Sequence, residues 1–111
     1  MRHSMMLNNE PYNKINRGYK DIEMRLYDEK RRLINIGDII TFTNRTNMES
    51  FDVIVIGLHI CNNFEELYSK FDKIRLGYNK DEEVSTSDMS KYYSNDDIDK
   101  YGVVGLEIKL I

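Results

Sequence analysis

Five stretches of this chain have the apolar and β-forming residues of β-strands, and two of them, 19–26 and 103–111, alternate apolar and polar positions as half-buried strands do. The last stretch runs from Val103 to Ile111, and its apolar side must be buried by pairing with other strands. The stretch 51–60 is apolar at most positions, which favours a central strand with both faces covered. The predicted strands span residues 2–7, 19–26, 39–43, 51–60 and 103–111.

Helical spacing, in which apolar residues recur at intervals of three and four, occurs between these strands. Asn63 followed by Glu66 resembles a capping box and opens the clearest amphipathic pattern. Gly18 and Gly102 each follow a helical stretch and favour its end there. The order of elements predicts one α+β domain over residues 1–111, a small, mainly antiparallel, five-stranded β-barrel flanked by short helices. The predicted helices span residues 10–17, 63–72, 87–93 and 95–101, with a charged turn at 28–34 and a long polar loop at 77–87.

The composition excludes several classes of protein. The chain has 111 residues, one cysteine and two histidines, so it is neither a disulfide scaffold nor an ordinary structural zinc protein. Its apolar stretches are far shorter than a membrane span, and Arg2 and His3 are not followed by the apolar core of a signal peptide. We therefore expect a cytoplasmic protein with a reduced thiol, no membrane partner, no metal and no cofactor.

The charge is distributed unevenly. Residues 1–45 hold 9 Lys and Arg against 6 Asp and Glu, whereas residues 46–111 hold 7 against 13. A basic first half suits a surface that faces a polyanion such as RNA. Solvated faces that balance one another in the folded protein explain the same distribution, and charge alone favours that explanation.

The segment 18–25 carries the densest candidate chemistry. Alternation along the predicted strand puts Lys20 on the apolar, inward face, and puts Glu23 and Arg25 on the other face. A lysine held in a cleft can act as a base or polarise a carbonyl, and an arginine can hold a phosphate. The alternative is an exposed Lys20 at the start of the strand, paired with a carboxylate.

A second candidate pair lies on the long apolar strand. His59 and Cys61 are two residues apart and share one face of that strand, so their side chains can meet. A cysteine beside a histidine can act as a nucleophile, but a buried cysteine near a satisfied histidine is the commoner arrangement. The chain has no phosphate-binding glycine loop, nucleophile elbow or paired-histidine metal motif.

Several segments, taken in order, resemble the activating signal cointegrator homology (ASCH) family. The opening segment combines Pro11 and Tyr12 with the later Gly18-x-Lys20-x-Ile22-Glu23-x-Arg25 pattern. The resemblance continues through Gly37-Asp38-Ile39-Ile40-Thr41-Phe42, Phe64-Glu65-Glu66-Leu67-Tyr68, Asp88-Met89-x-x-Tyr92-Tyr93 and Tyr101-Gly102-Val103-Val104-Gly105-Leu106-Glu107-Ile108. It therefore covers nearly the whole chain.

This resemblance implies a PUA-like β-barrel with a cleft lined by the Gly-x-Lys segment. It also implies a role in RNA or nucleoside chemistry. Some similar proteins are N(4)-acetylcytidine amidohydrolases, which use a lysine, a threonine three residues later and a glutamate from a later loop. Lys20 matches that lysine, Glu23 replaces the threonine, and Glu82 or Glu83 stands for the loop glutamate.

Two functions follow as expectations, and a third stays open. The first is a module that binds RNA or a modified nucleotide, with a base stacked on Tyr19 or Tyr27 and phosphates held by basic residues that include Arg25, Arg31 and Arg32. The second is a small amidohydrolase in which Lys20 and either Glu23 or Glu82 act on an acylated base. The third is a protein-interaction domain without nucleic acid, which the acidic net charge leaves open.

Overall fold

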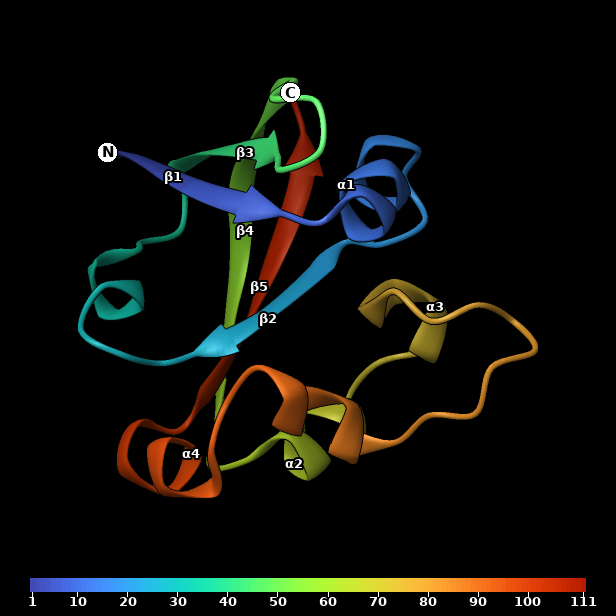
Figure 1. The fold of residues 1–111 in the computed structure, drawn as a ribbon. Helices are drawn as coiled ribbons and strands as arrows, with labels where there is room; N and C mark the ends of the chain where they lie inside the picture. Colours follow the sequence, from blue (N-terminus) through green and yellow to red (C-terminus); the bar gives the residue numbers. More distant parts are fainter.

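The computed structural model describes residues 1–111 as one curved sheet, with the first helix beside its upper part and helices of the second half of the chain toward its lower end (Figure 1). The strands are β1 (Arg2–Leu7), β2 (Ile22–Leu26), β3 (Ile39–Asn44), β4 (Ser50–Cys61) and β5 (Val103–Leu110). The α-helices are α1 (Asn9–Asn16), α2 (Phe64–Tyr68), α3 (Lys73–Leu76) and α4 (Asn95–Tyr101). Two 3-10 turns, η1 (Arg31–Leu33) and η2 (Thr86–Lys91), complete the chain.

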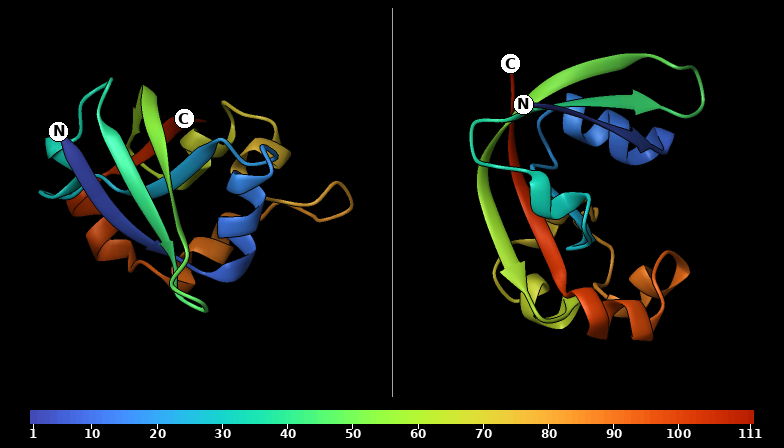
Figure 2. Two further views of the ribbon diagram at one scale, coloured as in Figure 1. Left: turned by 90° about the horizontal axis from the view of Figure 1, so that it is seen from above. Right: turned by 90° about the vertical axis from the view of Figure 1, so that its left-hand side faces the viewer.

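The sheet is a half-barrel with the strand order β1-β3-β4-β5-β2. Only the β1–β3 pair is parallel, and the other three pairs are antiparallel. The predicted α+β class and the mainly antiparallel, five-stranded sheet are therefore confirmed. The sheet curls so strongly that its two edge strands, β1 and β2, come to the same side of the molecule (Figure 2). They do not pair, so the barrel has an open seam.

Two apolar clusters hold this arrangement together. The first fills the inside of the curve, where Phe42, Val53 and Leu106 are fully buried beneath α1. The second lies between β2, β5 and the lower helices, around Ile22, Leu67 and other buried side chains. Because β5 pairs with both β4 and β2, its residues contribute to both clusters. No helix has the length and apolar character needed to cross a membrane.

The second strand begins later than its alternation predicts. The predicted strand started at residue 19, but β2 starts at Ile22. The backbone N–H groups of Tyr19 and Lys20 both donate to the carbonyl of Lys14, which extends the end of α1. Gly18 makes this possible because its φ of +84° lies in the left-handed region. Lys20 therefore lies outside the strand, where strand alternation does not fix the direction of its side chain.

The predicted helix at 63–72 is shorter in the structure, where α2 covers only Phe64–Tyr68, and the separate helix α3 that follows it was not predicted. The capping box is confirmed, because Asn63 Oδ1 accepts from the Glu66 N–H at 2.8 Å. The helix ends at Tyr68, and Asp72 caps the new helix α3 by accepting from the Ile74 N–H at 3.0 Å. Periodicity alone missed this break because Phe71, between the helices, still packs against the core.

Two predictions about burial are wrong in part. We expected β4 to be covered on both faces, but Ile56 and Ile60 are 46% and 51% exposed on its outer side. The helical spacing of the predicted helix at 87–93 also turns Tyr92 inward, but this residue is 63% exposed. Both predictions assumed that an apolar or aromatic side chain is buried, although much of the surface of a folded protein is apolar.

The close approach of α2 to β5 requires a residue without a side chain at position 105. A Cβ on Gly105 would lie 2.8 Å from Leu67 Cδ1 and 3.1 Å from Ile22 Cγ2. We therefore expect Gly105→Val to reduce the free energy of unfolding by about 1–3 kcal/mol through overpacking. Urea unfolding followed by circular dichroism measures this change, and an unchanged midpoint would mean that α2 moves away without cost.

Candidate functional site

A pocket lies at the open seam between the two edge strands. Its cavity has a volume of about 530 Å³. The Arg25 side chain spans the seam, because its Nη2 donates to the carbonyl of Met6 on β1 at 3.0 Å. Four parts of the chain line the pocket. They are β1 and the start of α1 (Met6, Leu7, Asn8, Pro11), β2 and the segment before it (Lys20, Glu23, Met24, Arg25), the β3–β4 loop (Arg45), and η2 with the residues after it (Met89, Tyr92, Tyr93).

Three charged side chains form a row in this pocket. Glu23 lies between two cations: its Oε1 is 2.8 Å from Lys20 Nζ, and its Oε2 is 2.8 Å from both Nε and Nη2 of Arg25. The side chains of Lys20, Glu23 and Arg25 are only 9%, 5% and 14% exposed. Two cations and one carboxylate leave a net positive charge at the pocket.

The two cations determine the charge state of the carboxylate. Burial alone would raise the pKa of Glu23, but the charges and hydrogen bonds of Lys20 and Arg25 outweigh burial and lower this pKa. Burial would likewise lower the pKa of Arg25, and the charge of Glu23 more than reverses that effect. Glu23 is therefore an ionised acceptor at neutral pH, with no proton to donate.

The row exists because Lys20 lies outside β2. Strand alternation predicted that Lys20 would face away from Glu23 and Arg25, and this prediction is wrong. In the structure Glu23 and Arg25 face the pocket from the strand, and Lys20 reaches Glu23 from the bend that precedes it. The sequence signal for this arrangement is Gly18, which ends α1 two residues before Lys20.

Aromatic and basic residues that the sequence analysis did not select complete the pocket. Tyr93 stacks on Phe64 with 5.9 Å between ring centroids, and burial raises the pKa of its hydroxyl. The neighbouring Tyr92 leaves most of its ring in solvent. Arg45 comes from the turn between β3 and β4 and is exposed. No local pattern connects this arginine with Lys20, because only the curl of the sheet brings them together.

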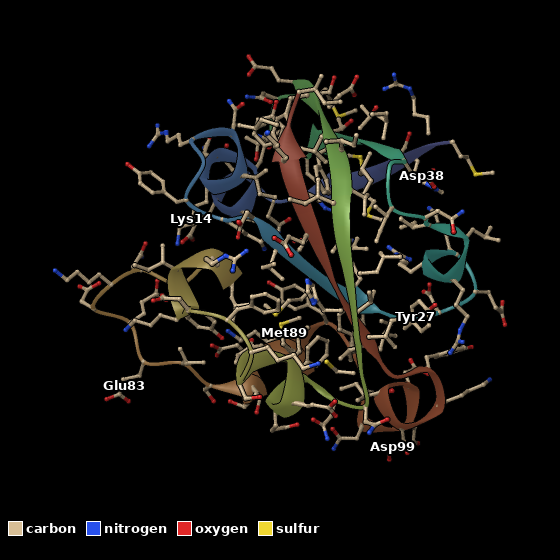
Figure 3. All side chains as sticks on the ribbon, turned by 180° about the vertical axis from the view of Figure 1, so that it is seen from behind. Lys14, Tyr27, Asp38, Glu83, Met89 and Asp99 are labelled. Carbon is tan, nitrogen blue, oxygen red and sulfur yellow. The ribbon has the colours of Figure 1, made fainter.

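The two loop glutamates lie apart from the pocket row. Glu82 borders a second, shallower recess of about 180 Å³, which shares Lys20 with the first pocket. Its Oε1 accepts from the N–H of Asn79 at 2.8 Å, so Glu82 is held by its own loop. Glu83 lies on the projecting part of this loop, away from the sheet and from the labelled Met89 (Figure 3). Glu23 and Glu82 thus lie in different cavities that meet at Lys20.

The four predicted residues outside the row do not line either cavity. Tyr19 is 62% exposed. Tyr27 packs against the first core cluster, and the Arg32 guanidinium lies over its ring at 4.3 Å. Arg32 also donates to the carbonyl of Tyr101, and Arg31 pairs with Asp28 at 3.2 Å. These contacts hold both arginines at the η1 turn.

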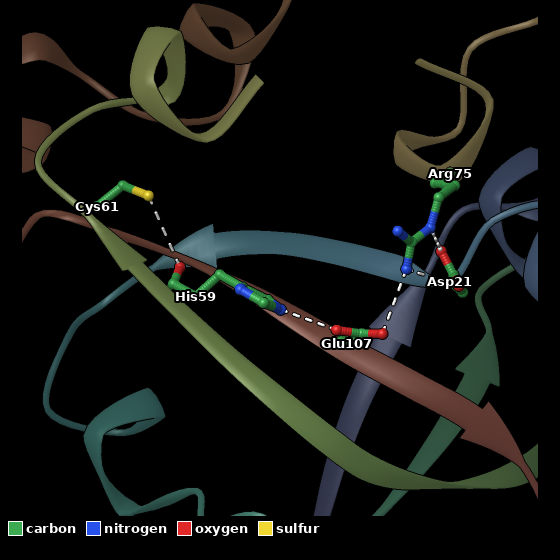
Figure 4. Close-up of polar contacts among 5 residues, drawn as sticks. All are labelled: Asp21, His59, Cys61, Arg75 and Glu107. Carbon is green, nitrogen blue, oxygen red and sulfur yellow. Dashed lines mark hydrogen bonds and ion pairs between the residues drawn. The ribbon is translucent and has the colours of Figure 1, made fainter. Parts of the chain in front are cut away.

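His59 and Cys61 do not form a catalytic pair. The Cys61 thiol points toward the carbonyl of His59 at 4.0 Å, whereas the His59 ring bonds to Glu107 at 2.8 Å (Figure 4). Cys61 is 4% exposed, and burial raises the pKa of its thiol. A buried thiol with a raised pKa is a poor nucleophile, so Cys61 serves as a core residue. No group of three His, Cys, Asp or Glu side chains is placed to hold a metal ion.

Comparisons with known proteins agree with this architecture. The family model for the ASCH domain matches residues 5–111. The crystal structure of hypothetical protein PH0355 is similar, with 34% sequence identity, full coverage of both chains and a TM-score of 0.84. The solution structure of protein PF0455 from Pyrococcus furiosus has 31% identity and a TM-score of 0.78, and the alignment covers 100% of this chain and 98% of that one. No curated protein matches the chain.

Proposed function

Because the chain belongs to the ASCH domain family, we propose that the seam pocket binds a nucleobase of single-stranded RNA or of a modified nucleotide. RNA binding is generally attributed to this family. The observation that carries the proposal is the buried Lys20–Glu23–Arg25 row in a pocket of about 530 Å³. Ligand sites are typically concave and mostly apolar, with a few converging polar groups.

The Lys20–Glu23–Arg25 row offers both hydrogen-bond donors and acceptors, as the edge of a nucleobase does. Each nucleobase presents amino or imino N–H donors beside ring-nitrogen or carbonyl acceptors. The ionised Glu23 accepts from such donors, and the remaining N–H groups of Lys20 and Arg25 donate to the acceptors beside them. Protein recognition of single-stranded RNA typically uses these edges of unstacked bases.

The rest of the pocket supplies a stacking surface and a phosphate contact. Tyr92 presents an exposed ring at the pocket wall, where an unstacked base can lie against it. Arg45 adds an exposed guanidinium beside the pocket, the group that binds phosphate most specifically. In this proposal both residues take roles that the sequence analysis gave to Tyr19, Tyr27, Arg31 and Arg32.

Hydrolysis of an N(4)-acylated base is a second candidate, supported by the position of Lys20 between Glu23 and Glu82. In that reaction water adds to the acyl carbon, the C–N bond breaks, and the amine nitrogen receives a proton as the carboxylic acid leaves. Lys20 would polarise the acyl oxygen, and a glutamate would take the proton from water. Binding is favoured over hydrolysis because both Glu23 oxygens are in ion pairs and a lowered pKa makes Glu23 a weak base.

One panel experiment tests both candidates. Calorimetry measures the binding of the four ribonucleosides, N(4)-acetylcytidine and a short single-stranded RNA, and chromatography detects released acetate. We expect binding of at least one ligand, a large loss in Lys20→Ala, and no loss in Lys30→Ala, whose side chain is exposed outside the pocket. Release of acetate that depends on Lys20 would instead support the hydrolase. No binding to any ligand at low salt would reject the binding module.

The phosphate contact gives a prediction of its own. We expect Arg45→Ala to weaken binding of the RNA and to reduce the slope of log K against log salt by about 0.7, the value for one contact to a single strand. Titrations at several salt concentrations measure this slope. Arg32→Ala is the comparison, and an equal loss there would extend the phosphate path along η1. An unchanged slope in Arg45→Ala would remove Arg45 from the interface.

A further inference from the structure

The turn that follows α3 closes the wall behind the Lys20 side chain. Gly77 ends this helix with a φ of +105°, and its Cα faces the end of the lysine. A Cβ on Gly77 would lie 3.0 Å from Lys20 Cδ and 3.6 Å from Lys20 Nζ. The ammonium of Lys14 also binds this turn, because its Nζ donates to the Gly77 carbonyl at 2.5 Å. The turn therefore packs directly on the part of Lys20 that carries the charge.

The helix itself is attached to the residue after Lys20. The backbone N–H of Asp21 donates to the carbonyl of Arg75 at 3.1 Å. The two side chains also form a fork, with Arg75 Nε 2.8 Å from Asp21 Oδ1 and Arg75 Nη2 3.1 Å from Asp21 Oδ2 (Figure 4). Lys20 and Asp21 are thus held by two residues of one short segment, Gly77 and Arg75.

Arg75 is tied in turn to the outside of the sheet. Its Nη2 lies 3.2 Å from Glu107 Oε2 on β5, and Glu107 Oε1 lies 2.8 Å from the His59 ring on β4 (Figure 4). Its guanidinium also lies 5.0 Å from the centre of the Phe71 ring. None of these residues lines the seam pocket. Arg75 therefore affects that pocket only indirectly, and the segment that it holds is the route that reaches Lys20 itself.

We propose that Arg75 is a positioning residue for Lys20, acting through Asp21 and through the turn at Gly77. The functional value of this positioning rests on the proposed function, because a fixed ammonium favours binding only if Lys20 contacts the ligand. Its structural part stands on the contacts alone. Arg75 and Asp21 are each 38% exposed, and ion pairs at such positions contribute little to stability. Loss of Arg75 should therefore release Lys20 while the fold remains intact.

The chemical reactivity of Lys20 tests this inference without any ligand. Reductive methylation with formaldehyde and a borohydride, followed by peptide mass spectrometry, measures the rate at each lysine of the folded protein. We expect Lys20 to react slowly in the parent protein. In Arg75→Ala its rate should rise at least about fivefold, which corresponds to a fall of about 1 kcal/mol in the free energy needed to expose the amine. Gly77→Ala should raise the rate at Lys20 in the same way, because its new methyl group displaces the lysine.

Controls separate positioning from a general loss of stability. The exposed Lys30 serves as the internal reference, and its rate should be the same in every variant. Exchanging the charges in the double variant Asp21→Arg, Arg75→Asp should restore slow reaction at Lys20. An unchanged Lys20 rate in Arg75→Ala, or an equal acceleration at every lysine, would overturn the inference. Because no ligand is used, these outcomes are independent of whether the pocket binds a nucleobase.

Discussion

Replacing Glu23 with Gln should reduce the free energy of unfolding by about 3–5 kcal/mol, the usual cost of removing one partner from a buried ion pair. The amide keeps the shape of the side chain but removes the negative charge between Lys20 and Arg25, whose side chains are only 9% and 14% exposed. Urea unfolding at neutral pH measures the loss. Glu29→Gln, at an exposed position, is the matched control and should change little.

The cost of this substitution should depend on pH in a defined direction. The pKa of Glu23 in the folded protein is lowered from its ordinary value, which is about 4. A lowered pKa gives a stabilising contribution that is complete above the pKa of the unfolded chain and is lost as the pH falls through the folded value. The difference between the parent and Glu23→Gln should therefore be constant above about pH 5 and shrink below about pH 4. A difference that is the same at every pH would mean that Glu23 is not held as a carboxylate.

Replacing Lys20 with Ala should reduce ligand affinity by about 10- to 100-fold, the loss expected for a charge-assisted hydrogen bond of about 1.5–3 kcal/mol. The effect on stability should be smaller than that of Glu23→Gln, because Arg25 still pairs with Glu23 at 2.8 Å. Calorimetric titration of the parent and the variant gives the affinities, and urea unfolding gives the stabilities.

The conservative replacement is the sharper test of that site. Lys20→Arg should not restore affinity, because a planar guanidinium cannot replace the compact ammonium that packs against Gly77. Full affinity in Lys20→Arg would reduce the role of Lys20 to a general positive charge. Full affinity in Lys20→Ala would remove the lysine from the site.

Most of the fold could be predicted because strand alternation and glycine positions are local signals. The last strand, the long central strand and the capping box at Asn63 were all identified from neighbouring residues. The break between α2 and α3 was missed because Phe71 continues the apolar spacing while the backbone leaves the helix. Apolar spacing records which side chains are buried, and a change in backbone hydrogen bonding leaves that spacing intact.

The candidate site could be predicted only where it is continuous in sequence. Lys20, Glu23 and Arg25 lie within six residues of one another and carry the resemblance to the family, so they were selected. Arg45 and Tyr92 reach the same pocket only because the sheet curls and η2, packed on α2, lies across the pocket from β1. The contact between Gly77 and Lys20 depends on the same tertiary arrangement, and no pairwise pattern in a single sequence reports it.

The most direct test of nucleobase binding at the seam is to identify which residues of the protein respond to a bound ligand. Isotope-labelled protein is titrated with a short single-stranded RNA and with the nucleoside that binds most tightly, and backbone amide shifts are recorded by NMR. We expect the largest changes at residues around the Lys20–Glu23–Arg25 row, at Arg45 and at Tyr92, and little change at Lys109 near the C-terminal end of the sheet. Shifts confined to the outer face around Arg75 and Lys109, or no shifts with any ligand, would contradict nucleobase binding in this pocket.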